Sequence, residues 1–566
     1  MARCVRVVTE NAALDRAFDY EVPAGMDPVG AGDRVRVELN HRSLRGWVLG
    51  ETEATRPVKA LKKWLGLGPP PELIALLEWA ARRWCAPLSR LLLAASPAGI
   101  VRQTPRAPAS APLDRAVAAH ARALAPGVVL VSPTHDPLGL ILHAYESTLG
   151  RPGSLLVLVP TEAWAQRLRG RLEQRGCAVA QGEGQWDRMR AGWPVVVGAR
   201  GAALAPTPRL RAAVVVDADD EAFRSQGTPT WDATTVLIER CRRDGADLWL
   251  TSVAPSPSLL AHGPVTTWDP VASGWPRVEV VDRRESDPHD GVLSRPALDA
   301  AHHALRGDEA VAVVVVLQRL GHGRLFACRR CGELARCAVC GAAEVLSEQR
   351  LACAEGHEPR ENFCRACAAT NLKAVRVGVS TLARDVAAQL SQRVDEVTAA
   401  FKGEVTARVV VGTEAVFARV RRCALVVFVD YDQYLLAPRE SARRQALIAV
   451  AKAGRLVGSR REGRGEVLVQ TRRDDEVIDA LHRGDVRAII DDDAATAKLL
   501  GLPPFAARAH VSGEGAGDFV HRLDRAAVRV SATADHYVVT APELDVLIEA
   551  INTTERPAAR VRVEVF

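Results

Sequence analysis

The spacing of apolar residues changes along the chain and divides it into parts. In the first hundred residues, apolar and polar positions alternate in short runs separated by Gly, Pro and Asp. This alternation predicts β-strands at Cys4–Val8, Arg34–Leu39 and Arg45–Gly50. Residues Pro71–Trp84 instead carry apolar side chains at helical spacing. We therefore expect a small β domain with one helix packed on its sheet.

From Gly127 onward, short apolar runs alternate with helical segments such as Ala163–Arg175. Continuously apolar strands are typical of a parallel sheet that is covered on both faces. One set is predicted at Val128–Ser132, Leu155–Pro160, Val195–Gly198, Ala212–Asp217 and Leu248–Ser252. A second set is predicted at Ala310–Leu317, Arg408–Gly412, Leu425–Asp430 and Glu466–Gln470. The pattern therefore predicts two α/β lobes.

Length and charge add little to this picture. A chain of 566 residues is long enough for three or four domains. Its 74 basic and 68 acidic side chains leave a net charge of +6, too small to indicate a nucleic-acid partner by itself. We find no targeting signal and no membrane-spanning run, so we expect a cytoplasmic protein with no membrane partner.

The most specific chemistry is a cluster of metal-ligand residues after the first strand of the second lobe. Seven of the twelve cysteines and one histidine lie in a single window: Cys328, Cys331, Cys337, Cys340, Cys353, His357, Cys364 and Cys367. A Cys-x-x-Cys pair presents two thiolates from one turn, and two such pairs complete a tetrahedral zinc site. The alternative is a disulfide scaffold, but the absence of a secretion signal and the scattering of the other cysteines favour zinc.

Eight ligands fill two zinc sites and leave no open coordination position, which indicates a structural role. We expect one ion to be held by Cys328, Cys331, Cys364 and Cys367. We expect the other ion to be held by Cys337, Cys340, Cys353 and His357. A solvated loop histidine is the alternative interpretation of His357.

Six segments, taken in order, resemble the PriA family of primosomal proteins, which restart stalled replication forks and belong to the superfamily-two DNA helicases. They are Leu14–Pro23 with Gly32–Leu39, Val195–Asp217, Arg319–Cys340, Gly412–Phe417, Val450–Arg455 and Gly501–Ala509. The resemblance implies an α/β multidomain fold: two RecA-like helicase lobes with an inserted two-zinc module, a small β-rich N-terminal DNA-binding domain and a C-terminal α+β domain.

The resemblance also implies the domain boundaries. They are 1–104 for the domain that binds a DNA 3′ end, 105–126 for a Pro/Ala-rich linker, 127–265 for lobe 1, 266–475 for lobe 2 with the zinc module at 325–370, and 476–566 for the C-terminal domain. The linker is too short for the winged-helix domain that the family usually carries there, so we expect that domain to be missing.

The ATP site of the family is altered here. A helicase of this class needs a glycine-rich loop whose amides cradle phosphates, followed by a Lys and a Ser or Thr. The matching segment is Ser132–Gly139, with Leu138 at the lysine position and Gly139 at the hydroxyl position. Pro133 and Pro137 also remove amide donors. Because leucine offers no charge to a triphosphate, we expect this loop to have lost the ability to bind ATP.

Three further motifs depart from the family pattern. The acidic DEEH motif is Asp217–Asp220, whose second residue is alanine in place of the carboxylate that orients the attacking water. Motif III, which is normally Ser-Ala-Thr, reads Ser252-Val253-Ala254 here. In motif VI, Ile448 and Lys452 replace the usual Gln and first Arg, and Arg455 remains; lysine is no planar substitute for an arginine finger. We therefore predict a helicase fold without catalytic residues, bound ATP, or ATPase and helicase activity.

The N-terminal motif is retained. Phe18, Asp19 and Tyr20 stand where the family holds the terminal nucleotide of a nascent leading strand, and Lys59 stands at its basic position. An aromatic ring can stack on the terminal base, a carboxylate can accept a hydrogen bond from the 3′-hydroxyl, and an ammonium can contact a phosphate. The alternative is that Phe18 and Tyr20 are strand residues with a ring in the core.

The resemblance thus implies a replication restart protein that recognises stalled or abandoned forks through the 3′ end of the leading strand. It would promote primosome assembly and reloading of the replicative helicase. The expected partners are branched DNA, primosome and helicase-loading proteins, and the single-stranded DNA-binding protein, with the protein at the nucleoid. An active ATP-dependent 3′-to-5′ helicase is the alternative, and a structural zinc protein decaying without function is a third hypothesis.

Overall fold

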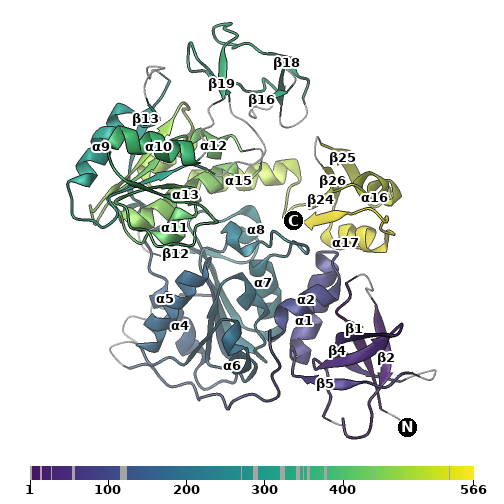
Figure 1. Ribbon diagram of the computed structural model, residues 1–566. Coiled ribbons are helices and arrows are strands. Elements are labelled where there is room, and N and C mark those ends of the chain that lie inside the picture. The colour runs from purple at the N-terminus through teal and green to yellow at the C-terminus, as the bar shows by residue number, and fades with distance from the viewer. Residues whose placement is uncertain are drawn as a thin grey trace.

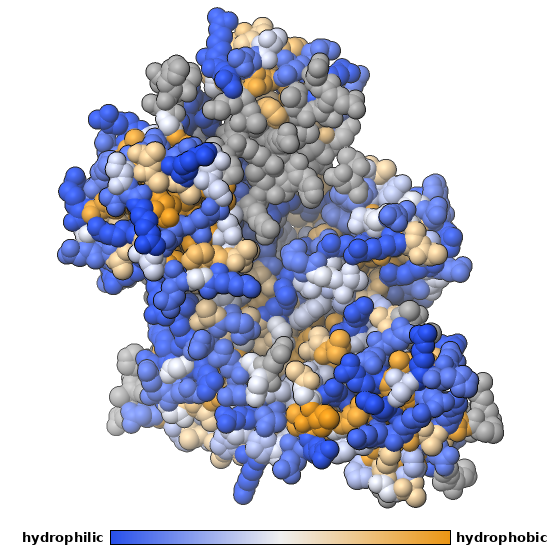
Figure 2. Space-filling model, in the orientation of Figure 1, coloured by the Kyte–Doolittle hydropathy of each residue, from blue (hydrophilic) through white to orange (hydrophobic). Residues whose placement is uncertain are grey.

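The computed structural model shows a β-rich N-terminal domain, two α/β lobes, a small cysteine-rich module and a C-terminal domain (Figure 1). It describes residues 3–12, 16–26, 28–53, 58–114, 124–268, 271–284, 291–318, 326–339, 344–347, 350–353, 357–374, 379–437, 439–533 and 536–566. Hydrophilic side chains cover most of the face seen in Figure 2, with apolar residues in small groups between them. Within the described ranges, no helix has both the length and the apolar character needed to cross a membrane.

The N-terminal domain is an antiparallel five-stranded sheet in the order β2-β1-β4-β3-β5. Its strands are β1 (Cys4–Thr9), β2 (Ala17–Glu21), β3 (Arg34–Leu39), β4 (Arg42–Thr52) and β5 (Lys63–Gly66). The three predicted strands are confirmed, and the two edge strands β2 and β5 were missed. Asn40 and His41 join β3 to β4 with φ of 49° and 61°, the left-handed backbone that a tight hairpin requires.

A helical hairpin follows the sheet and joins three domains. It consists of α1 (Pro71–Arg83) and α2 (Leu88–Ala95). Helix α1 was predicted to pack on the sheet. Its buried leucines in fact belong to an apolar cluster that also contains residues of lobe 1 and of the C-terminal domain. Polar contacts add to this: Arg82 pairs with Glu549 at 2.7 Å, and Arg556 donates to the Cys85 carbonyl. The helical hairpin therefore attaches the N-terminal domain to lobe 1 and to the C-terminal domain.

Lobe 1 is a parallel seven-stranded sheet in the order β12-β6-β11-β10-β7-β9-β8. Its strands are β6 (Gly127–Leu130), β7 (Ser154–Leu158), β8 (Val179–Gln181), β9 (Val195–Gly198), β10 (Leu210–Val215), β11 (Asp247–Ser252) and β12 (Val265–Thr267). Its helices are α4 (Leu138–Thr148), α5 (Glu162–Glu173), α6 (Trp186–Arg190), α7 (Ala233–Asp244) and α8 (Pro257–Leu260). All five predicted strands are confirmed to within a few residues.

Lobe 2 is a parallel six-stranded sheet in the order β13-β23-β22-β14-β21-β20. Its strands are β13 (Arg277–Asp282), β14 (Val313–Val316), β20 (Val394–Val397), β21 (Val409–Gly412), β22 (Leu425–Phe428) and β23 (Glu466–Thr471). Its helices are α9 (Arg295–Leu305), α10 (Val379–Leu390), α11 (Val416–Arg419), α12 (Asp432–Leu435), α13 (Ala442–Val457) and α14 (Glu476–Arg483). Because β13 precedes β14, the cysteine-rich module follows the second strand of this sheet, and the expectation that it follows the first was wrong.

The module consists of two small sheets above lobe 2 (Figure 1). They are formed by β15 (Phe326–Cys328) with β19 (Leu372–Ala374), and by β16 (Glu344–Ser347), β17 (Arg350–Cys353) and β18 (Arg360–Glu361).

The C-terminal domain follows α15 (Arg487–Leu500) and has the expected α+β character. Its antiparallel sheet has the order β25-β26-β24-β27. The strands and helices are β24 (Ala507–Ser512), β25 (Arg529–Ala532), β26 (Tyr537–Ala541), β27 (Arg562–Val565), α16 (Ala516–Arg522) and α17 (Leu544–Thr553). The predicted arrangement of two α/β lobes with a cysteine-rich insertion between β-rich and α+β terminal domains is confirmed.

The shared apolar cluster around α1 leads to a stability prediction. Leu77→Ala should lower the free energy of unfolding by about 2–5 kcal/mol, since it removes a fully buried side chain and leaves a cavity. Leu93→Ala, in the neighbouring helix, is the matched control; its side chain is 53% exposed, so the change should stay within about 0.5 kcal/mol. Urea unfolding followed by circular dichroism measures both, and equal losses would contradict the packing described.

Candidate functional site

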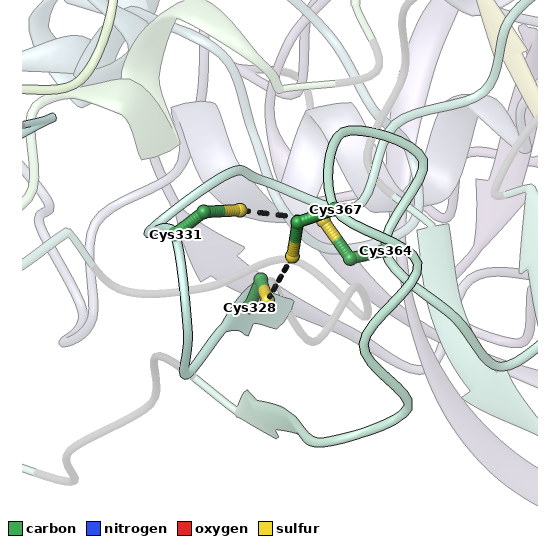
Figure 3. Close-up of side chains that lie close together, drawn as sticks. All are labelled: Cys328, Cys331, Cys364 and Cys367. Atoms are coloured by element: carbon green, nitrogen blue, oxygen red, sulfur yellow. Dashed lines mark hydrogen bonds between the residues drawn. The ribbon is translucent and has the colours of Figure 1, made fainter.

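Four cysteines of the module lie close together at the junction of two turns (Figure 3). Pairing of β15 with β19 places Cys328 and the following Cys331 beside the turn that carries Cys364 and Cys367. The sulfur atoms of Cys328 and Cys367 are 3.5 Å apart, as are those of Cys331 and Cys364. Such separations exclude a disulfide of about 2.05 Å. They approach the roughly 3.8 Å expected between sulfurs that each lie about 2.3 Å from one zinc ion.

The surroundings of Cys328 favour a thiolate. Burial opposes its ionisation, but hydrogen bonds from the backbone amides of Cys331 and Arg330 stabilise the anion and lower the pKa of this thiol to about 7. Burial raises the pKa of two neighbouring thiols, that of Cys331 to about 12 and that of Cys364 in the same direction. The thiolate is the form that binds metal, and the four sulfur atoms lie close enough together to hold a metal ion.

A second group of possible ligands lies in the same module. Cys337, Cys353 at the end of β17, and His357 bring their ligand atoms within 4.8 Å of one another, and the Cys353 sulfur lies 3.4 Å from Nδ1 of His357. Cys340, the fourth predicted ligand, lies outside the described residues. The module therefore contains two separate groups of residues that could hold a metal ion.

In the N-terminal domain, the three predicted pocket residues lie on β2 and face both sides of the sheet. Tyr20 is buried in the core and its hydroxyl donates to the Glu38 carbonyl at 3.1 Å. Phe18 packs partly against the same core, with the Arg16 guanidinium 4.9 Å from its ring centre. Because neighbouring side chains alternate along a strand, Asp19 points to the other face, where Arg6 lies 3.3 Å away. The alternative interpretation of Phe18 and Tyr20 was that one of their rings lies in the core. This is the position of the Tyr20 ring.

Lys59 lies beside the end of β2, since its carbonyl accepts a hydrogen bond from the Glu21 amide. Its ammonium group is 3.1 Å from Glu38, which also pairs with Lys62. Hydrogen bonds from Lys62 and then Lys59 lower the pKa of the Glu38 carboxyl to about 2. Sequence reasoning missed Glu38; its only signal was an acidic position on β3 opposite a run of lysines. The carboxylate partly neutralises the cations that a phosphate would meet.

The segment that matches the phosphate-binding loop contains a carboxylate, that of Asp136. Asp136 accepts a hydrogen bond from the Leu138 amide at 3.1 Å, at the N-terminus of α4. Arg171 of α5 donates hydrogen bonds to the same carboxylate from both terminal nitrogens, at 3.0 and 2.5 Å. The Leu138 side chain is buried in the core of the lobe. A helix N-terminus usually attracts an anion; here the chain's own Asp136 occupies that place.

The altered motifs meet at the interface between the two lobes. Asp217, two residues after β10 and with φ of 57°, accepts a hydrogen bond from Arg455 at 2.7 Å. Lys452 lies 3.1 Å from Asp220 and 3.2 Å from Glu414. The pairs of Arg455 with Asp217 and of Lys452 with Asp220 cross the cleft, whereas Glu414 belongs to the same lobe as Lys452. These groups are thus paired and not arranged around an open binding site.

The third carboxylate of the acidic motif, Asp219, lies within lobe 1. It accepts hydrogen bonds from the Ser252 hydroxyl and the Ser256 amide, and burial raises its pKa. The cavity that remains beside it is lined by Asp217, Ser252, Ile448, Lys452 and Arg455, among others, and measures about 10 Å³, room for about one water molecule. This cavity by itself is too small for a nucleotide.

Comparison with known proteins identifies the N-terminal domain. Residues 6–97 match the family model of the PriA 3′ DNA-binding domain. The replication restart protein PriA of Bacillus subtilis is 23% identical over 374 residues, which cover 59% of this chain and 46% of that protein. PriA of Treponema pallidum is 27% identical over 417 residues, covering 65% and 61%. The resemblance to the PriA family is confirmed. The chain spans about half to three-fifths of the length of these relatives.

Solved helicase structures are similar only weakly. Yeast Dbp5, bound to RNA and ADP BeF3, covers 65% of this chain and 89% of its own, with a TM-score of 0.36 and 10% identity. The Mycobacterium smegmatis helicase Lhr, bound to single-stranded DNA and AMP-PNP, covers 64% and 46%, with a TM-score of 0.35 and 12% identity. At these scores the likeness assigns no activity to the chain.

Proposed function

We propose that this chain is a replication restart protein that binds stalled or abandoned forks at the 3′ end of the nascent leading strand. It would promote primosome assembly and reloading of the replicative helicase without ATP-driven unwinding. The observation that carries the proposal is the match of residues 6–97 to the PriA 3′ DNA-binding domain. Such a role places the protein in the cytoplasm, at the nucleoid, with branched DNA as its first partner.

The loss of ATPase activity is supported by the contacts that replace a nucleotide. A triphosphate needs amide donors at a helix N-terminus and a lysine, but the Leu138 amide at the start of α4 donates to Asp136 and the Leu138 side chain is buried. The remaining motif VI arginine, Arg455, is held by Asp217. The active-helicase alternative would require all of these contacts to break.

In the proposed DNA-end site, the terminal nucleotide lies against the sheet edge formed by β2. Asp19 accepts the 3′-hydroxyl on one face of this strand, and the partly exposed ring of Phe18 contacts the nucleotide from the other face. Lys59 and Lys62 supply charge to the adjacent phosphate. Asp19 pairs with Arg6 and the lysines pair with Glu38 in the free protein, so DNA competes with internal partners. Tyr20 supports the strand from the core side through its hydrogen bond to Glu38.

The module is proposed to bind two zinc ions in structural sites. One ion takes Cys328, Cys331, Cys364 and Cys367, and the other takes Cys337, Cys340, Cys353 and His357. The sulfur separations of the first group and the soft, mixed donor set of the second fit zinc.

The same module is proposed to present the surface for primosome and helicase-loading proteins. Val339 and Phe363 are 75% and 39% exposed on it, and exposed apolar side chains are suited to protein contacts. The single-stranded DNA-binding protein is a further proposed partner.

Metal analysis tests the proposed sites. The purified protein should contain about two zinc ions per chain by atomic emission. Cys331→Ser should remove one of them, and His357→Ala should weaken only the other. Cys177→Ser is the matched control, because Cys177 is buried in lobe 1, away from both groups, and should leave the zinc content unchanged. Iron, or a total of one zinc per chain that His357→Ala does not reduce, would overturn the two sites.

The DNA-end pocket predicts a preference for the chemistry of the 3′ end. A fork ending in a 3′-phosphate should bind about tenfold more weakly than one ending in 3′-OH, since a charged hydrogen bond of roughly 1.5–3 kcal/mol is lost. Asp19→Asn should remove this preference in fluorescence anisotropy. Glu51→Gln, another salt-bridged carboxylate of the same sheet, should keep it. Equal affinity of the unmodified protein for both ends would leave a non-specific DNA-binding protein.

The pairing of Glu38 predicts the direction in which its removal acts. Glu38→Gln should raise affinity for both fork ends, because Lys59 and Lys62 then keep their full charge for phosphates. The salt dependence should steepen by roughly 0.7 in log–log slope for each lysine that gains a single-strand phosphate contact. Titrations at several salt concentrations measure this, with Glu173→Gln in lobe 1 as the control. A weaker, less salt-dependent complex would show that Glu38 itself shapes the pocket.

For catalysis, DNA-stimulated phosphate release should be indistinguishable from the blank without protein. Leu138→Lys alone should not restore it, because that side chain points into the core and Asp136 still caps α4. A coupled ATPase assay on forked DNA provides the measurement. Steady turnover that Asp217→Ala abolishes would establish the active-helicase alternative.

A further inference from the structure

We propose that an ion-pair network between the lobes replaces the nucleotide and locks the two lobes in one closed arrangement. This inter-lobe latch consists of three bases of lobe 2 and three acids of lobe 1: Arg439, Lys452, Arg455, Asp217, Asp220 and Glu221. The inference goes beyond the proposed function, because it concerns how the lobes are held and requires no fork.

The latch pairs two chain segments in opposite order. Asp217 lies opposite Arg455, with Oδ2 and Nη1 2.5 Å apart. Asp220 lies 3.1 Å from the Lys452 ammonium group. Glu221 lies 2.5 Å from Arg439. The acids lie within the six residues that follow β10, whereas the bases lie on α13 and just before it. This register fixes the position of α13 on lobe 1 along its length.

Two of the three pairs are largely shielded from water. The side chains of Asp220 and Asp217 are 6% and 11% exposed, and those of Lys452 and Arg455 are 19% and 26% exposed. Burial opposes the charge on Lys452, yet Asp220 and Glu414 outweigh it and raise the pKa of this lysine. Removing one partner of such a pair leaves a poorly solvated charge behind. The third pair, Arg439 with Glu221, is more exposed and contributes less.

Arg455 ties the latch to two further parts of lobe 1. Its Nε donates to the carbonyl of Pro133 at 3.0 Å, in the segment that matches the phosphate-binding loop. Its guanidinium lies 5.1 Å from the ring centre of Trp164 on α5. Beside it, Gly454 packs so tightly that an added Cβ would meet Pro276 at 2.9 Å and Pro133 at 3.5 Å. Helix α13 thus rests directly on the loop where phosphates would lie.

The consequence follows from how ligands shift conformational equilibria. A nucleotide shifts the equilibrium between open and closed lobes only by the difference in its binding free energy for the two states. Here the contacts of the closed state belong to the chain itself. The lobes therefore stay closed without a ligand, and they hold the N-terminal domain and the cysteine-rich module at a fixed distance from one another.

Hydrogen–deuterium exchange of the full, zinc-loaded chain tests the latch. In the double variant Lys452→Gln/Arg455→Gln, amides of residues 138–142 and 450–457 should exchange roughly tenfold faster or more, because buried charges lose their partners. Strands β10 and β22 should keep their protection. Arg464→Gln is the control: it also removes an arginine charge, but its partner Glu462 lies in the same loop. In the unmodified protein, Mg²⁺ and ATP should change nothing at these segments.

Unchanged exchange in the double variant would overturn the latch, since the apolar contacts between the lobes would then suffice. Added protection on binding Mg²⁺ and ATP would overturn it as well. If the double variant loses protection throughout the chain, the charge exchange Asp220→Lys/Lys452→Glu decides. Protection regained relative to Lys452→Glu alone supports the latch, and no gain refutes it.

Discussion

The contact between α13 and lobe 1 constrains the rest of the molecule. This helix buries eleven of its sixteen residues, and one apolar cluster contains residues from the strands of lobe 1, from α13 and from the strands of lobe 2, together with Trp275. At the edge of this apolar contact, Lys452 and Arg455 meet the carboxylates that follow β10. The two lobes therefore share a core as well as a set of charges. Their relative position then determines where every attached domain lies.

The segment around α12 links this interface to the module and the C-terminal domain. Leu436 packs against Ala327 and Leu334 of the module. Asp432 is fully buried, accepting hydrogen bonds from the Thr471 hydroxyl and the Arg472 amide. A few residues on, Arg439 reaches lobe 1 and Glu440 pairs with Arg508 of the C-terminal domain. Two residues of the module, Ala327 and Leu334, thus contact the segment around α12, so binding of the proposed zinc ions, which would order the module, would also place these contacts.

The same electrostatic pattern recurs in the N-terminal domain and in the lobes. Cations that could meet phosphate are held by nearby carboxylates: Lys59 and Lys62 by Glu38, and Arg171 by Asp136. In the exposed N-terminal domain such pairs are weak, so a polyanion can displace them. Between the lobes the pairs are shielded and tightly packed, so they are not readily exchanged. The same residue types thus form two kinds of contact. The exposed pairs of the N-terminal domain can be displaced by a ligand, whereas the shielded pairs between the lobes act as a structural contact.

The sequence alone determined the two lobes and the cysteine groups. Buried parallel strands leave continuous apolar runs, and Cys-x-x-Cys pairs place two thiols in one turn whatever surrounds them. Among the missed strands, β2, β5, β12, β13 and β20 have mixed exposure, so their pattern carries little signal. Asp19 and Lys59 could be named from the resemblance, but the burial of Tyr20 and the pairing of Lys59 could not.

Only the tertiary structure decided which charges meet. Asp136 pairs with Arg171 across 35 residues, and Asp217 pairs with Arg455 across 238. The altered motifs predicted a loss of ATP binding, but they gave no sign that Lys452 and Arg455 would pair with carboxylates of the other lobe. Such partners are brought together by the packing of α13 on lobe 1. Apolar periodicity fixes a strand or helix locally, whereas an ion pair between distant segments depends on how the finished domains dock.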